Sequence, residues 1–187
     1  YVQNKYKELH LFINEEQIRN YFPVKHVVSK TFEYFSKLFN IEIREAAHLP
    51  LWNSDVKYYE IFENNQKISS FFFDPYARNG KMPGAWADGI IVRDFEIQQR
   101  LPVAMIVCNN PKDNNTESTF KFYELVTFFH EFGHLLHHCL SKLDYSMFSC
   151  FNNVQRDAIE FPSQFLENFV YQYEVIEYIS SHIETKE

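Results

Sequence analysis

One five-residue segment, His130-Glu131-Phe132-Gly133-His134, constrains this chain more than any other feature. It lies in a run with helical spacing of apolar residues, so histidines four positions apart project from one helix face. Two imidazoles on one face can bind a single metal ion, and this His-Glu-x-x-His pattern is typical of Zn²⁺ sites. Glu131 is rotated from His130 by about 100° and can reach a water at the metal. The segment therefore predicts a zinc hydrolase with Glu131 as its general base.

The third metal ligand has to come from a second element, because a catalytic zinc takes three protein ligands and keeps one position open. The best candidate is Glu160, in the segment Asp157-Ala158-Ile159-Glu160. Glu167 lies two helical turns further on and is the alternative. If Glu160 is the ligand, Glu167 shares its face and is a candidate to orient a ligand imidazole from outside. Asp157 is a second candidate for that outer role.

Other interpretations of these residues stay open. His134 and His138 are also four residues apart, although only His130 is followed directly by a glutamate. We interpret His137 as a packed residue or as an outer partner of a metal-bound histidine. Glu160 can also be an ordinary first-turn acid, which the helix macrodipole favours.

Composition narrows the class of partner. The 187 residues are 45% hydrophobic, enough for one domain with a real core. A net charge of -7 and the lack of Lys/Arg runs argue against nucleic acid. No apolar stretch approaches the roughly 18 residues of a membrane span. The three cysteines, Cys108, Cys139 and Cys150, lack zinc-ribbon spacing and predict reduced, partly buried thiols in the cytoplasm.

The two ends and the 18% aromatic content predict a piece of a longer protein. The chain starts at Tyr1 with no secretory apolar region and stops at Glu187 with no clear helix stop signal.

Three regions are expected in one catalytic core. Residues 1–40 form a helical lead-in, with helix starts at Asn14 and Pro23. Residues 41–108 form a small sheet with turns at Asn64-Asn65 and Asn79-Gly80, and its predicted strands are 41–44, 56–62, 68–73, 85–92 and 103–107. A polar loop over 109–119 follows.

Residues 119–187 are expected to carry the metal site on two long helices. The first covers 119–140 with Thr119 as its N-cap, and the second covers 158–183 with Asp157 as its cap. Pro162 is expected in or near the first turn of the second helix. The predicted fold class is α+β, with a small antiparallel or mixed sheet.

Beyond the zinc pattern, the sequence resembles the thimet oligopeptidase family, which includes oligopeptidase A and the peptidyl-dipeptidases. FFHEFGHLLHH (residues 128–138) resembles the family's signature helix. EFPSQFLEN (160–168) resembles its third-ligand segment, and by that match Glu160 is the ligand. FDPYARNGK (73–81) and GAW (84–86) resemble the block before the zinc helix, and Trp52 with Asp55-Val56 also fits. The likeness is closest to the oligopeptidase A and peptidyl-dipeptidase branch.

The resemblance implies a zinc-dependent oligoendopeptidase or dipeptidyl carboxypeptidase that cuts short peptides in a cleft between two mostly helical lobes. Family members are several times longer, so the missing lobes of the parent chain are expected partners, and the piece alone is expected to be weakly active. An extended peptide is expected to add to a free sheet edge at Gly84-Ala85-Trp86-Ala87, an ordinary core strand being the alternative. Arg78 and Lys81 are candidates to contact a substrate carboxylate, with surface salt bridges as the simpler interpretation.

Two further alternatives concern function and metal. The first is a different zinc enzyme, such as a carboxypeptidase that releases single residues. The second is a non-catalytic, zinc-stabilised fragment or binding module, against which an open coordination position would argue. Nitrogen and oxygen sites of this kind also accept cobalt or manganese.

Overall fold

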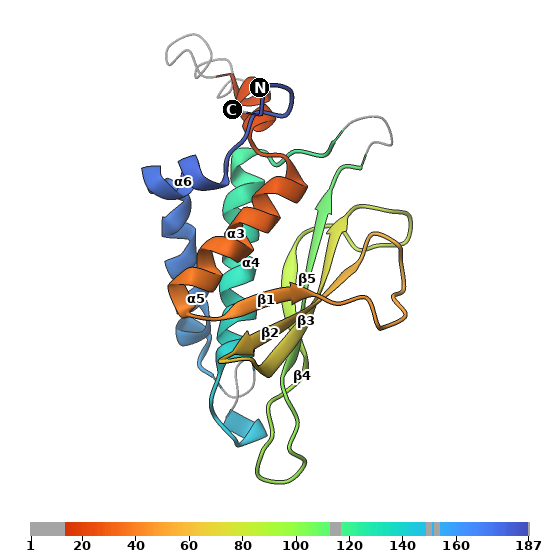
Figure 1. Cartoon of the computed structure of the whole chain (residues 1–187), viewed down its shortest axis with the longest axis vertical. Helices are drawn as coiled ribbons and strands as arrows, with labels where there is room; N and C mark the ends of the chain where they lie inside the picture. The colour runs from red at the N-terminus through yellow and green to blue at the C-terminus, as the bar shows by residue number, and fades with distance from the viewer. Residues whose placement is uncertain (1–13, 113–116, 149–150, 152–153, 187) are drawn as a thin grey trace.

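A computed structural model describes residues 14–112, 117–148, 151 and 154–186. Within them a five-stranded mixed sheet forms one layer, and the helices lie on one side of it (Figure 1). The predicted α+β class is therefore confirmed.

The N-terminal helices begin where the sequence predicts. The Asn14 side chain accepts hydrogen bonds from the N–H groups of Glu16 and Gln17 and caps the short helix α2 (Glu15–Ile18). After the 3₁₀ turn η1 (Arg19–Tyr21), Pro23 precedes α3 (Val24–Phe39), which ends at a left-handed Asn40. The apolar spacing of α3 buries one face, formed by Val24, Val27, Val28, Thr31, Phe32 and Phe35.

All five predicted strands are present. They are β1 (Glu42–Glu45), β2 (Lys57–Glu63), β3 (Gln66–Tyr76), β4 (Trp86–Ile91) and β5 (Val103–Asn110). Their order is β1-β2-β3-β5-β4, and every pair is antiparallel except β3 with β5. Asn64 and Asn65 both have positive φ, as a tight hairpin turn requires. The predicted loop after the sheet starts later than expected because β5 extends to Asn110.

Phenylalanine rings fill the space between the helices and the sheet. The ring centroid of Phe32 on α3 lies 5.5 Å from that of Phe71 on β3 and 5.2 Å from that of Phe132. Phe132 belongs to α4 (Phe122–Leu140), the helix with the His-Glu-x-x-His segment. The many aromatic side chains therefore form a packed core that holds α4 against the sheet.

Three predictions about the first turns of the helices are wrong. Helix α4 begins after Lys121, because the Glu124 carboxylate accepts the Lys121 N–H at 2.8 Å, whereas Thr119 accepts a hydrogen bond from Arg19. Helix α5 (Arg156–Glu167) follows Gln155, so Asp157 lies inside its first turn. Pro162 lies well inside α5 and not in or near its first turn.

The single helix predicted over 158–183 is also wrong. It is three segments: α5, the 3₁₀ turn η3 (Asn168–Tyr171) and α6 (Tyr173–Ile179), with extended backbone at Gln172. Val170, Val175 and Ile179 are all buried. The break lets the chain turn and bury apolar residues from both halves, which one straight helix would not do. A further 3₁₀ turn, η2 (Ser146–Phe148), precedes α5.

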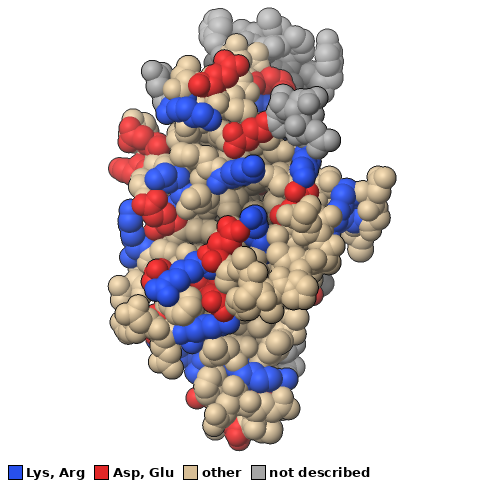
Figure 2. All heavy atoms as spheres, turned by 45° about the vertical axis from the view of Figure 1, so that its right-hand side comes forward, with Lys and Arg blue, Asp and Glu red and all other residues tan. Residues whose placement is uncertain are grey.

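The structure also shows the surface charges, the helix lengths and the burial of the cysteines. On the face in Figure 2, basic and acidic side chains are interspersed and no broad area has one sign. None of the described helices combines the length and apolarity needed to cross a membrane. Cys108 and Cys139 are buried, and burial raises the pKa of the Cys108 thiol to about 12. Cys150 lies outside the described residues.

Candidate metal centre

The metal centre depends on a close approach of α4 and α5. A Cβ atom added to Gly133 on α4 would lie 2.6 Å from Ser163 Cα and 2.8 Å from the Pro162 carbonyl oxygen. Both atoms are backbone, so only glycine allows the two helices to lie this close. The contact brings Glu160 of α5 to the two histidines of α4.

Three ligand-type atoms converge at this point. His130 Nε2 and His134 Nε2 are 3.2 Å apart, and Glu160 Oε2 is 3.3 Å and 3.2 Å from them. Tetrahedral zinc with ligand distances of about 2.0–2.1 Å requires separations of about 3.3 Å. The three atoms therefore have the spacing of one face of a zinc tetrahedron.

The hydrogen bonds around these residues also favour a cation. Glu167 Oε1 lies 2.6 Å from Nδ1 of His130, so that nitrogen is the donor and Nε2 keeps its lone pair. His134 Nδ1 is buried without a hydrogen-bond partner in the described part of the chain. Two imidazole nitrogens and a carboxylate that face one another repel unless a positive charge lies between them. The donor set thus fits Zn²⁺.

Glu131 lies beside this cluster and is only 9% exposed. Its pKa is raised, first by burial and also by the charge of Glu160, while His130 and a hydrogen bond from the Ala87 backbone act in the opposite direction. A raised carboxylate pKa suits a group that accepts a proton near neutral pH and later returns it.

The remaining candidate site residues lie at different places around the three ligand-type atoms. Glu167 Oε1 lies 2.6 Å from His130 Nδ1, and its outer role stays a prediction. His137 is half-buried and its Nδ1 has no partner among the described residues, so its assignment as a packed residue or an outer partner stays a prediction. Asp157 is exposed and makes no hydrogen bond or ion pair to the histidines in the described structure. Its predicted outer role is therefore unsupported.

His138 does not join His134 in a metal site. Its ring is 1% exposed, and its Nε2 lies 2.9 Å from the Ile91 carbonyl oxygen on β4. A Cβ at Gly89 would lie 2.5 Å from this ring, so glycine makes room for it. This contact was not predicted from the sequence, although an isolated glycine within a strand pattern is a sign of close approach.

Strand β4 offers a free edge next to the centre. It pairs with β5 on one side only and ends the sheet in the described structure. Gly84, with φ of 101°, and the half-buried Ala85 lead into this strand. Because the Ala87 backbone reaches Glu131, an edge suited to main-chain pairing lies beside the metal centre.

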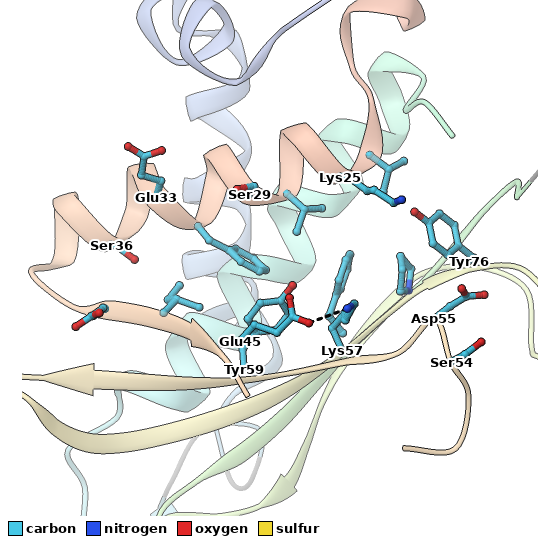
Figure 3. Close-up of a pocket in the computed structure, with 17 residues that line it drawn as sticks. Lys25, Ser29, Glu33, Ser36, Glu45, Ser54, Asp55, Lys57, Tyr59 and Tyr76 are labelled. Carbon is cyan, nitrogen blue, oxygen red and sulfur yellow. Dashed lines mark hydrogen bonds and ion pairs between the residues drawn. The ribbon is translucent and has the colours of Figure 1, made fainter. Parts of the chain in front are cut away.

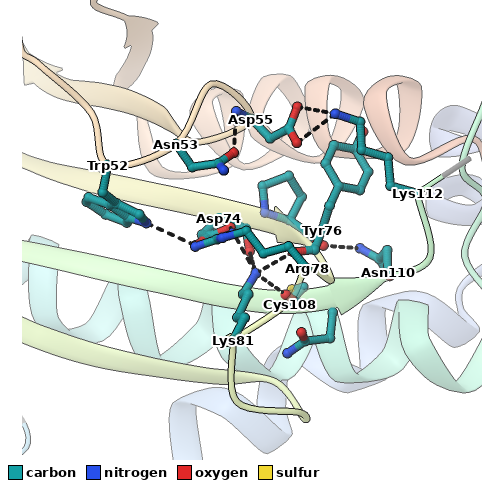
Figure 4. Close-up of polar contacts among 12 residues, drawn as sticks. Trp52, Asn53, Asp55, Asp74, Tyr76, Arg78, Lys81, Cys108, Asn110 and Lys112 are labelled. Carbon is teal, nitrogen blue, oxygen red and sulfur yellow. Dashed lines mark hydrogen bonds and ion pairs between the residues drawn. The ribbon is translucent and has the colours of Figure 1, made fainter. Parts of the chain in front are cut away.

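A buried polar cluster holds the segment that leads into β4 (Figure 4). Arg78 donates two hydrogen bonds to the Asp74 carboxylate, at 2.6 Å and 2.7 Å. The Lys81 ammonium lies within 2.6–3.0 Å of four oxygens, which belong to Asp74, Tyr76 and Cys108. Arg78 and Lys81 therefore form ion pairs with Asp74, but the pair of Lys81 with Asp74 is buried and is not the surface salt bridge that was predicted.

Comparison with known proteins identifies the family. The whole chain, residues 1–187, matches Peptidase family M3. The chain belongs to this family. It is 41% identical over 183 residues to oligopeptidase A of Haemophilus influenzae, covering 95% of this chain and 27% of that protein. It is 38% identical over 192 residues to oligopeptidase A of Escherichia coli, covering 100% and 28%.

A more distant M3 relative supports the same assignment. Dipeptidyl carboxypeptidase of Escherichia coli is 32% identical over 176 residues, covering 92% of this chain and 26% of that protein. The resemblance to the oligopeptidase A and peptidyl-dipeptidase branch is therefore confirmed. The chain spans about a quarter of the length of these relatives.

A large cavity in this M3 chain lies elsewhere. It measures about 860 Å³ and lies between α3 and strands β1 to β3, lined by residues such as Lys25, Tyr59 and Tyr76 (Figure 3). Lys57 and Glu45 form an ion pair there at 2.7 Å. None of the three converging ligand residues lines it. The candidate metal centre is therefore identified by its converging ligand atoms and not by the volume of a cavity.

Proposed function

We propose that this chain carries the zinc-binding and catalytic core of a metallopeptidase that cuts short peptides. The observation that carries the proposal is the convergence of His130, His134 and Glu160 within 3.3 Å beside the buried Glu131. Three protein ligands leave a coordination position open, as catalytic zinc sites do. Relatives named oligopeptidase A and dipeptidyl carboxypeptidase support the cleavage of short peptides, and the second name refers to dipeptide release.

In this proposal the side chains divide the work. His130, His134 and Glu160 hold Zn²⁺, which when bound lowers the pKa of a water and polarises the scissile carbonyl. Glu131 accepts a proton from the attacking water and delivers it to the leaving amine. Glu167 fixes the His130 ring through Nδ1, so that Nε2 faces the metal. Burial keeps the Glu131 carboxylate close to the reacting groups and poorly hydrated.

The proposed substrates are short, extended peptides. Such a chain can pair with the free edge of β4 through main-chain hydrogen bonds that do not depend on side-chain identity. A cytoplasmic location stays a prediction. The name of one relative, organellar oligopeptidase A of Arabidopsis thaliana, 41% identical over 184 residues, refers to chloroplasts and mitochondria.

The test compares two isosteric changes in the intact protein. Glu131→Gln should keep stoichiometric zinc by elemental analysis and lower peptide turnover about 10²–10⁴-fold, because only the proton acceptor is lost. Glu160→Gln should lose zinc. The exposed Glu174 on α6 provides the control, since Glu174→Gln should change neither.

Each outcome has a separate meaning. If Glu131→Gln keeps more than half of the normal turnover, the base is elsewhere. If the normal protein holds zinc but cuts no peptide, the non-catalytic, zinc-stabilised alternative is correct.

A further inference from the structure

A second, smaller cavity lies one helical turn from the metal centre. It measures about 300 Å³ and lies between the chain entering β4, the end of β5 and the start of α4. Phe120, Phe128 and Ala85 supply apolar walls, and Tyr123, Glu124 and Thr127 supply polar ones. A space of this size holds one side chain of a bound peptide.

The cavity adjoins the proposed general base on two elements. Thr127 precedes Glu131 by four residues on α4, about 6 Å along the same helix face. On the other side, Ala85 lines the cavity, and two residues later Ala87 reaches Glu131. Cys108 lines the cavity too, and the charge of Glu131 contributes to the raised pKa of its thiol. A peptide on the β4 edge would therefore place a side chain here, one or two residues from the cleaved bond.

Most polar side chains of the cavity have their donors already engaged. The Tyr123 hydroxyl donates to Glu124 Oε1, and the Thr127 hydroxyl donates to the Tyr123 carbonyl. Asn109 donates both of its amide hydrogens, to the carbonyl oxygens of Met82 and Gly84. Asn110 donates to the Pro75 carbonyl and is the one amide of the lining left with a spare N–H. The lining side chains therefore offer a ligand mainly hydrogen-bond acceptors.

The cavity also carries a carboxylate, Glu124, that is not ion-paired among the described residues, because the nearby Lys81 is bound to Asp74. Glu124 accepts hydrogen bonds from Lys121 N and the Tyr123 hydroxyl, and it forms no ion pair among the described residues. Arg19, whose charge acts on Tyr123, is instead hydrogen-bonded to Glu16 and Thr119. Acceptors, one carboxylate and aromatic walls suit a long side chain that has an apolar stem and only donors at its end.

We propose that this cavity is a specificity pocket for a basic side chain, arginine foremost, of the peptide substrate. The proposal rests on the proposed peptidase function. Arginine fits best because its guanidinium has five donors and no acceptor, and it stacks on an exposed aromatic ring such as that of Tyr123. Glu124 is the residue that recognises the charge.

The experiment uses the intact protein and pairs of quenched-fluorescent peptides that differ only in arginine or its neutral isostere citrulline. Each pair places the residue at one position within two residues of the cleaved bond. At one position kcat/KM should favour arginine by about 10- to 100-fold, the size expected for a charge-assisted hydrogen bond. Glu124→Gln should reduce this ratio to less than about threefold, and Glu174→Gln should leave it unchanged.

A second variant guards against a folding defect in Glu124→Gln. Thr127→Lys adds a fixed ammonium to the lining and should also abolish the preference for arginine. The preference surviving in both variants, or no preference at any position, overturns the proposal.

A measurement without turnover separates this proposal from the peptidase function. Fluorescence anisotropy of the same labelled peptides on zinc-free protein should show tighter binding of the arginine peptide. If no peptide is cleaved but arginine still binds more tightly, the peptidase proposal fails and the pocket stands. Equal binding of the two peptides refutes the pocket even if both are cleaved.

Discussion

Gly133→Ala is the most direct test of how the structure builds the metal centre. The added Cβ would lie 2.6 Å from Ser163 Cα and 2.8 Å from the Pro162 oxygen, whereas ordinary carbon contacts are about 3.5–4.0 Å. The backbone of α5 must therefore withdraw from α4 by about 1 Å. That shift carries Glu160 Oε2 away from the histidine nitrogens, from 3.2–3.3 Å now to about 4 Å.

Gly133→Ala should change both the stability of the protein and its zinc affinity, and the sign of the stability change is informative. Alanine in place of glycine inside a helix ordinarily stabilises by about 0.5–1 kcal/mol. Overpacking costs about 1–3 kcal/mol, so a net loss of about 1–2 kcal/mol is expected. Zinc affinity should fall by about 10- to 100-fold, the range seen when groups that position metal ligands are disturbed.

The assay is chelator competition for zinc affinity and thermal unfolding of the zinc-free protein for stability. Gly89→Ala is the matched control, because its Cβ would meet the His138 ring and not α5. It should lose stability but keep zinc. If Gly133→Ala keeps normal zinc affinity and becomes more stable, the close helix contact does not position Glu160, and the reasoning is refuted.

Three further predictions concern the surroundings of the site. Glu167→Gln should keep zinc stoichiometry but weaken zinc affinity about 10-fold or more, measured by chelator competition, because the hydrogen bond to His130 Nδ1 loses its charge. Burial acts to raise the pKa of Asp74, but hydrogen bonds from Arg78, Lys81 and Trp52 outweigh it and hold the pKa below its usual value. The ionised pair therefore contributes stability above about pH 4, and this is lost as pH falls through the lowered pKa. Asp74→Asn should cost about 3 kcal/mol at pH 7 in denaturant unfolding, and the difference from the normal protein should shrink toward pH 3. The 187-residue chain by itself should bind one zinc yet show kcat/KM at least about 100-fold below that of the intact protein, because it covers about a quarter of its relatives' length.

Local chemistry explains why many expectations from the sequence were correct. Asn14 caps a helix through contacts two and three residues away, and Asn64-Asn65 sets a hairpin turn by its own backbone preference. The strands were recognisable from period and composition alone. Thr119 failed as a cap because Lys121 and Glu124 satisfy the helix start, and its hydroxyl accepts from Arg19. That choice depends on a residue 100 positions away.

At the metal centre, too, some features follow from the local sequence and others from contacts between distant segments. The sequence by itself determined that His130 and His134 share a helix face with Glu131 beside them, because helical periodicity is a property of the backbone. It left Glu160 and Glu167 as alternative ligands, since residues seven apart lie on the same face of a helix. The family resemblance favoured Glu160, and the packing of α5 against Gly133 places Glu160 against both Nε2 atoms and Glu167 against Nδ1 of His130, a difference that periodicity does not contain. Interhelical distance is set by side-chain volume at the contact, which no periodicity within one segment encodes.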